Sequence, residues 1–139
     1  MYNQDIETPV PEKVARYKAA IEGSDALLFV TPEHSRSIPA VVQNALDWGA
    51  RPYGKTSWPG KPGAVIGTTP GAIGTAVAQQ HLKAVLGDQG VILAGGEAYI
   101  TWKPDLVAAD HTVADESVRG FLQSFIDKFA TLVGKLVPA

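Results

Sequence analysis

One stretch, residues 26–48, constrains the fold of this chain more than any other. A short apolar run, Ala26-Leu-Leu-Phe-Val30, is followed by a polar loop with two prolines, residues 31–39, and then by an amphipathic segment, residues 40–48. A buried strand, a loop and a helix in this order are typical of one repeat of an open parallel sheet. Because small ligands bind outside the carboxyl ends of the strands in such sheets, the loop is the first candidate for a functional site.

The rest of the chain continues this alternation of helices and strands. Helical spacing of apolar residues and short apolar runs bounded by glycine and proline predict, in order, helix 12–22, strand 26–31, helix 40–48, strand 63–67, helix 75–86, a third strand formed by 91–93 and 99–100 and bent at Gly95-Gly96, and a last helix capped by Asp115. Residues 102–114 are expected to be irregular. Parallel strands need crossover helices on the faces of their sheet, so the order predicts a single three-layer α/β domain over residues 1–139.

Composition excludes several classes of function. A formal net charge of -2 offers no basic surface for nucleic acid or for an anionic membrane. Without cysteine the chain has no disulfide, thiolate nucleophile or cysteine-ligated metal, and its histidines lack metal-ligand spacing. No apolar run of about 18 residues and no signal-peptide pattern is present, so we expect no metal, a cytoplasmic location and a small-molecule partner.

Two loops are placed to bind that partner. The second, Thr69-Pro-Gly-Ala-Ile-Gly-Thr75, resembles the first in joining a strand to the N-terminus of a helix, where free N–H groups favour an anion or an electron-rich ring edge. Gly71 and Gly74 would let a ligand approach the backbone, and Thr69 and Thr75 would add hydroxyl donors. The alternative is a tight turn with an N-cap.

Two other features are open to more than one interpretation. Glu33, His34 and Ser35 are the residue types of a hydrolytic triad, but sequence neighbours rarely aim at one another and no G-x-S-x-G elbow is present. The connection 49–62 is longer than is usual between a helix and a strand, which suggests a working or interface surface. Trp58 is expected to be its exposed aromatic residue, with loop anchoring or subunit contact as its favoured role.

The motifs together resemble the NADPH-dependent FMN reductase family, which has a flavodoxin-like fold and includes quinone, chromate and azo-dye reductases. The resemblance rests on Thr31-Pro-Glu-His-Ser-Arg-Ser-Ile-Pro39 running into Gln43-Asn-Ala-Leu-Asp-Trp48, on Arg51-Pro52 and Gly60-Lys-Pro62, and on Thr69–Thr75 with Ala78-Gln79. It covers nearly the whole chain in one register. It implies an enzyme that uses FMN to pass electrons from NADPH or NADH to a small-molecule acceptor.

The resemblance also implies which residues contact the flavin. By position, Pro32, Glu33, His34, Ser35 and Ser37 would lie along the isoalloxazine ring, and Thr69, Pro70, Gly71, Gly74 and Thr75 would cover its other edge. Members of the family commonly have Tyr and Asn in place of His34 and Ser35. Similar proteins form dimers or tetramers with flavin sites near the subunit boundary, which makes Arg51, Tyr53 and Trp58 interface candidates.

The chain departs from the family pattern at its N-terminus. Members begin with a strand, a phosphate-binding loop, a helix and a second strand, and Tyr2-Asn-Gln-Asp5 matches the segment just after them. The expected sheet therefore holds strands 3, 4 and 5 of the usual five, with 26–30 as an uncovered apolar edge. Two functions stay open: an FMN-dependent NAD(P)H oxidoreductase, and a non-catalytic flavodoxin-like remnant that oligomerises or binds a partner without flavin.

Overall fold

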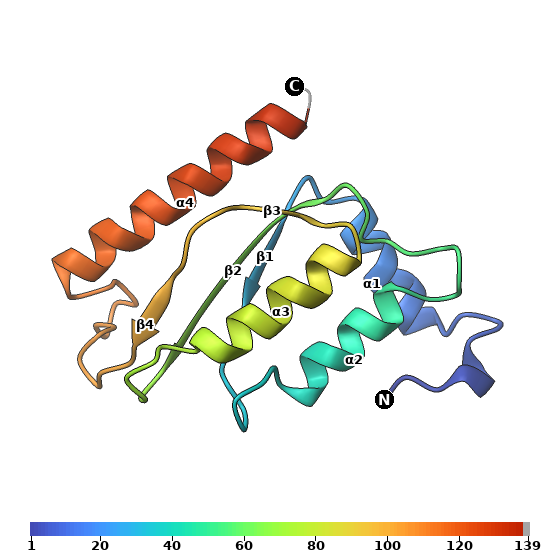
Figure 1. Cartoon of the computed structure of the whole chain (residues 1–139), viewed down its shortest axis with the longest axis horizontal. Coiled ribbons are helices and arrows are strands. Elements are labelled where there is room, and N and C mark those ends of the chain that lie inside the picture. The colour runs from blue at the N-terminus through green and yellow to red at the C-terminus, as the bar shows by residue number, and fades with distance from the viewer. Residues whose placement is uncertain (138–139) are drawn as a thin grey trace.

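A computed structural model describes residues 1–137 of the chain. Helices and short strands alternate along it, as the sequence predicts (Figure 1). The elements are a 3-10 turn, η1 (Gln4–Ile6), followed by α1 (Glu12–Glu22), β1 (Leu27–Val30), α2 (Ala40–Gly49), β2 (Pro62–Thr69), α3 (Ala76–Asp88), β3 (Ile92–Leu93), β4 (Tyr99–Thr101) and α4 (Glu116–Leu136).

The sheet is parallel and β2 is its central strand. On one side β1 pairs with β2, Leu27 lying opposite Gly63. On the other side β2 pairs first with β3, Pro62 opposite Ile92, and then with β4, Gly67 opposite Tyr99. The segments β3 and β4 are thus two parts of one interrupted edge strand, which confirms the predicted bend.

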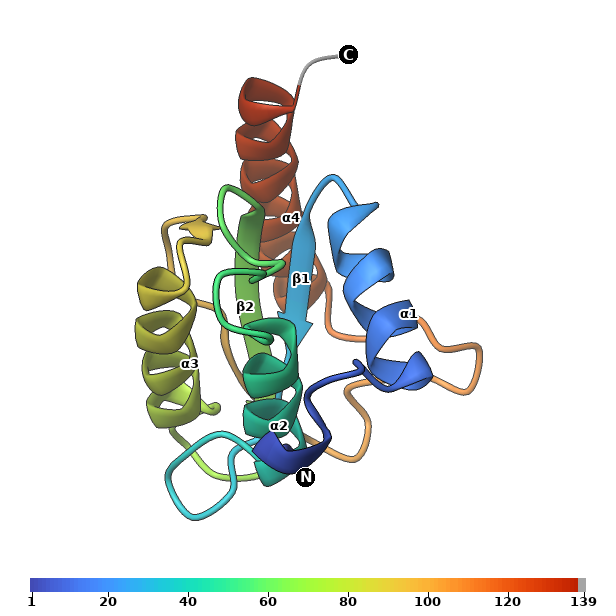
Figure 2. The same cartoon turned by 90° about the vertical axis from the view of Figure 1, so that its right-hand side faces the viewer.

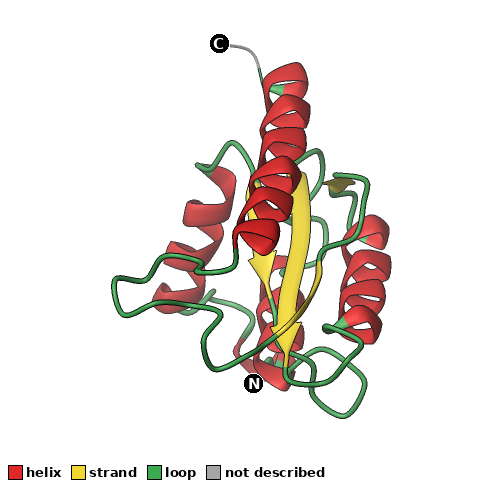
Figure 3. Cartoon of the chain, turned by 90° about the vertical axis from the view of Figure 1, so that its left-hand side faces the viewer, coloured by secondary structure: helices red, strands yellow, loops and turns green. Residues whose placement is uncertain are grey.

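Helices cover both faces of this sheet (Figures 2 and 3). Side chains alternate along a strand, so Val65 points to the face that carries α1, α2 and α3, whereas Ala64 points to the face that carries α4. The larger core lies on the first face and includes Ile21, Leu46, Trp58, Leu82 and Leu86; Phe125 and Phe129 close the second. The three-layer α/β architecture is confirmed.

The β1 edge is only partly covered. Leu28 and Val30 lie beside Ala64 and Ile66 on the α4 face, yet they are 46% and 70% exposed. Helix α4 packs over β2 and reaches Ala26, but it leaves Leu28 and Val30 largely uncovered. The expectation of an apolar edge at residues 26–30 is confirmed.

The long connection between α2 and β2 is pinned to the domain rather than free. Trp58 is 1% exposed, packs in the larger core and donates its indole N–H to Leu46 O at 3.1 Å. A Cβ on Gly49 would lie 2.2 Å from this ring, so glycine leaves room for it at the end of α2. The expectation that Trp58 is exposed is wrong; of its two favoured roles the structure supports loop anchoring and leaves no surface for a subunit contact.

Charged side chains hold the same connection from outside the core. Lys18 Nζ donates to Gly49 O at 3.1 Å and to Lys55 O at 2.6 Å, and its burial lowers the pKa of this ammonium. Lys61 Nζ donates to Glu22 O at 2.7 Å and to Ser24 O at 2.5 Å. These four carbonyl groups, at the ends of α1 and α2 and in the connection, therefore have donors inside the protein.

Candidate functional site

The two predicted loops lie together at the carboxyl ends of β1 and β2. Because the strands are parallel, residues 31–39 and 69–75 leave the sheet at the same end (Figure 1). Residues at the outer parts of both loops, such as Pro32, Ser35, Pro70 and Gly71, are exposed. This end of the sheet is where ligands bind in open α/β folds.

Glu33 fastens one loop to the other. Its Oε2 accepts hydrogen bonds from the backbone N–H groups of Val77 and Ala78, both at 3.1 Å, and its Oε1 accepts one from Arg36 Nη1 at 2.9 Å. The Ala78 N–H, together with the Arg36 guanidinium, holds the pKa of this carboxyl below its usual range. Since the Glu33 side chain is 6% exposed, it faces protein, and only its backbone is free to contact a ligand.

The tip of the first loop is a tight hairpin. His34 and Ser37 exchange backbone hydrogen bonds of 2.9 and 2.8 Å around Ser35 and Arg36, whose φ angles are 49° and 61°. Two successive left-handed residues define a type I′ turn, which favours asparagine and glycine. Such strain clusters at binding sites and persists where neighbouring contacts hold it. One such contact joins Ser37 Oγ to His81 Nδ1 of α3 at 3.1 Å.

The structure does not support a hydrolytic triad in this loop. The Glu33 carboxylate points to the first turn of α3, and His34 is held through its backbone to Ser37. The three side chains therefore form no acid–base–nucleophile relay, in line with the sequence argument against one.

The two glycines of the second loop have different surroundings. A Cβ on Gly71 would meet nothing nearer than Thr69 Cγ2 at 3.8 Å, so its backbone is open to solvent. A Cβ on Gly74 would lie 2.6 Å from the backbone carbon of Tyr99, and Gly74 has a φ of 53°. Gly74 is therefore needed for close packing on β4, and its expected role in letting a ligand approach the backbone stays a prediction.

Thr75 also faces inward. It is fully buried, its hydroxyl donates to Gly74 O at 2.5 Å, and it accepts from Gln79 Nε2 at 2.9 Å. The expected hydroxyl donor at this position is not free, and Thr75 does not cap α3 with its side chain either. Thr69 remains half-buried at the mouth of the loop.

Sequence reasoning missed two functional features here. Gln79 is fully buried and donates to Ala98 O at 2.8 Å, which ties α3 to the interrupted edge strand. The capping role of Glu33 was also missed. No local signal could have found it, because Thr75 is itself a suitable N-cap residue and only the structure shows its hydroxyl bonded to Gly74 O.

The outer backbone of both loops can bind a polar ring edge. Within residues 1–137 the N–H groups of Ser35, Arg36, Ala72 and Ile73 donate to no acceptor of the protein. They project at the end of the sheet together with the open backbone of Gly71. Uncharged donors of this kind suit the nitrogen and oxygen acceptors of a planar heterocycle.

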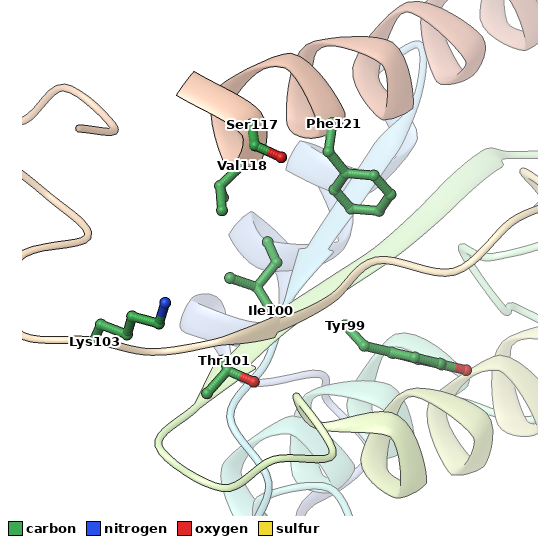
Figure 4. Close-up of a pocket in the computed structure, with 7 residues that line it drawn as sticks. All are labelled: Tyr99, Ile100, Thr101, Lys103, Ser117, Val118 and Phe121. Carbon is green, nitrogen blue, oxygen red and sulfur yellow. The ribbon is translucent and has the colours of Figure 1, made fainter. Parts of the chain in front are cut away.

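The hollows elsewhere do not include these loops. One of about 360 Å³ lies between β4 and the start of α4, where Ile100, Val118 and Phe121 approach one another and Tyr99 turns away toward α3 (Figure 4). An adjoining hollow of about 390 Å³ shares Lys103 and Ser117 with it. In the described part of the chain, no group of three His, Asp or Glu side chains could hold a metal ion. No helix there is long and apolar enough to cross a membrane.

Comparisons with known proteins agree with this geometry. Residues 1–103 match the family model described as NADPH-dependent FMN reductase. A 2-hydroxy-1,4-benzoquinone reductase from a Burkholderia species is 45% identical over 134 residues, which cover 96% of this chain and 73% of that protein. A quinone reductase from Pseudomonas putida is 43% identical over 135 residues, covering 96% and 72%.

Solved structures give the same relationship. FerB from Paracoccus denitrificans, a flavoenzyme NAD(P)H:(acceptor) oxidoreductase, superposes with a TM-score of 0.93 at 49% identity, covering 97% of this chain and 75% of that one. The apo form of an NADH:FMN oxidoreductase, EmoB, has a TM-score of 0.72 at 19% identity and supports the fold alone. The chain belongs to the NADPH-dependent FMN reductase family.

Proposed function

We propose that this chain works as an FMN-dependent NAD(P)H oxidoreductase with a small quinone-type acceptor. The observation that carries the proposal is the pair of loops at the carboxyl ends of β1 and β2, clamped through Glu33 and presenting free backbone N–H groups. The names of its relatives, which reduce benzoquinones and other quinones, support the acceptor class. Chromate and azo dyes, reduced by other members of the family, are the wider alternatives.

The residues of the two loops fit the polar edge of a flavin. We assign the ring contacts to Pro32, Glu33, His34 and Ser35 through their backbone, to Ser37 and Thr69 through their hydroxyls, and to Pro70 and Gly71. Gly74 and Thr75 shape the loop from inside. When bound, FMN supplies the redox chemistry between NAD(P)H and the acceptor. The chain positions the flavin: the donors assigned to it are backbone N–H and hydroxyl groups, which are uncharged across the physiological pH range.

Assembly and location form part of the proposal. We assign the chain to a homodimer or homotetramer in the cytoplasm, where NADPH and NADH are available as donors. Arg51 and Tyr53 remain candidates for the subunit contact, and Tyr53 is 91% exposed. The alternative of a flavin-free binding protein is favoured by one observation, the exposed Leu28 and Val30 on the β1 edge, which would suit a partner chain.

Flavin retention tests the proposal directly. The purified chain is mixed with FMN and desalted, and its absorption spectrum and mass are measured on the same sample. A retained yellow chromophore, with quinone-dependent NADPH or NADH oxidation, is the expected result. A colourless protein would favour the flavin-free alternative.

A matched pair of variants localises the site. Gly71→Val places a side chain in open space at the mouth of the loop, so the fold should persist while flavin is displaced. Gly120→Val adds the same side chain in open space on α4, on the other face of the sheet, and should keep the flavin. Equal flavin content in both variants would remove the second loop from the site.

A further inference from the structure

The Glu33 carboxylate joins two segments that are 44 and 45 residues apart in the sequence. Its partners on the far side, the N–H groups of Val77 and Ala78, belong to the first turn of α3. Helices usually satisfy such groups with the side chain of their own N-cap residue. Here the N-cap Thr75 turns its hydroxyl to Gly74 O, so Glu33 supplies the cap across space.

The other oxygen of the same carboxylate holds the first loop. Arg36 Nη1 lies 2.9 Å from Glu33 Oε1, and Arg36 is the second residue of the left-handed turn. Neither Ser35 nor Arg36 favours this backbone conformation, so the turn depends on its contacts. One carboxylate therefore fixes the start of α3 with one oxygen and the hairpin with the other.

This arrangement has a consequence for the ligand. The free N–H groups of Ser35 and Arg36 lie in the hairpin that Arg36 anchors, and those of Ala72 and Ile73 lie in the loop that leads into α3. A planar ligand held by both sets needs them at one fixed separation. Glu33 joins the first loop to the start of α3, beside the Ser37–His81 hydrogen bond, and the second loop leads directly into that helix.

We propose that Glu33 is a positioning residue, which sets the separation of the two loops and thereby the affinity for FMN without touching the flavin through its side chain. The inference rests on the proposed function. It differs from a plain capping role, which would raise the stability of α3 and leave the affinity of the folded protein unchanged.

The chain offers a matched control for the capping role. Asp115 Oδ1 accepts from the N–H groups of Ser117 and Val118 at 2.9 and 3.1 Å, which reproduces at α4 what Glu33 does at α3. Asp115 caps α4, which packs on the other face of the sheet from α3, and within residues 1–137 its carboxylate bonds only to the first turn of its own helix. Asp115→Ala thus removes a helix cap of the same geometry without altering the loop separation.

The experiment measures FMN dissociation constants by flavin fluorescence, at a temperature where circular dichroism finds each variant folded. Glu33→Ala should bind FMN about tenfold or more weakly, the scale of losing hydrogen bonds to a charged group. Glu33→Gln should lie between, because its amide oxygen still accepts from α3 but no longer pairs with the charge of Arg36. Asp115→Ala should melt earlier and bind FMN as the wild type does.

Each result has a distinct meaning. Wild-type affinity in folded Glu33→Gln and Glu33→Ala overturns the inference and leaves Glu33 as a cap. Equal weakening in Asp115→Ala also overturns it, since general stability would then explain the loss. If Glu33→Ala does not fold, Glu33→Gln decides alone. A wild-type chain that binds no FMN overturns the proposed function and this inference with it, whereas wild-type binding with unaffected variants overturns the inference only.

Discussion

The connection 50–61 and the loops 31–39 and 69–75 all contain proline or glycine among polar residues, but their backbone polar groups differ in whether the protein bonds them. The connection turns the Trp58 indole inward, and Lys18 donates to the carbonyl groups of Lys55 and of the preceding Gly49. The two loops turn the acidic side chain of Glu33 inward and leave N–H groups outside. Loop length and glycine or proline content therefore do not separate a binding loop from an anchored one. The two loops differ from the connection in their position at the carboxyl ends of the strands and in their unused backbone donors, which is why we propose them as the binding loops.

The largest predicted effect is a loss of stability when the anchor of the connection 50–61 is removed. Trp58→Ala removes a fully buried ring that contacts Tyr17 and Phe29, so it should lower the free energy of unfolding by about 3–5 kcal/mol. Urea unfolding followed by circular dichroism measures the loss. A change below about 1 kcal/mol, the size of an average point mutation, would mean that the connection is not pinned by this residue.

Lys18 gives the second test of the anchored connection. Lys18→Met keeps the apolar stem but leaves Lys55 O without a donor and Gly49 O with the Ser57 N–H alone, so the protein should lose about 1–3 kcal/mol. Lys13→Met, on an exposed position of the same helix, is the control and should stay within about 0.5 kcal/mol of the wild type. Equal losses in both variants would show that the charge of α1, and not the contact, matters.

A third prediction compares the two glycines inside one loop. Gly74→Ala forces a Cβ against the β4 backbone at a positive φ and should cost about 1–3 kcal/mol. Gly71→Ala should remain within about 0.5 kcal/mol of the wild type, because its Cβ meets open space. Thermal unfolding of the pair measures the difference. A stable Gly74→Ala would mean that the loop can move away from β4.

The fold could be predicted because its signals are local. Apolar spacing in 12–22 and 116–136, and the short runs at 26–30 and 63–67, each specify one element, and parallel strands then require helices on both faces. Even the interruption at Gly95-Gly96 could be predicted, since glycine breaks a strand locally.

The site was predicted less completely because its decisive contacts are remote. Glu33 meets α3 more than forty residues along the chain, and Gly74 differs from Gly71 only because β4 passes beside it. Trp58 is buried by α1, α2 and β1 together, none of which is visible from its own loop. Because both loops follow parallel strands, the sequence was enough to place them together at one end of the sheet. The orientation of each side chain could be seen only in the tertiary structure.

The smallest effect concerns the acid sensitivity of the Glu33 clamp. Its carboxyl has a lowered pKa in the folded protein, so its contribution to stability is present above the unfolded pKa of about 4.3 and is lost as the pH falls through the lower folded value. The groups that face this carboxylate are the Arg36 guanidinium and the backbone N–H groups of Val77 and Ala78. The free energies of unfolding of the wild type and Glu33→Gln should therefore differ most above about pH 5 and converge as the pH falls through the lowered folded pKa of Glu33. Denaturant titrations across this range measure the convergence. A constant difference would mean that the clamp acts through shape alone, and a difference that grows on acidification would contradict the ionised state of Glu33.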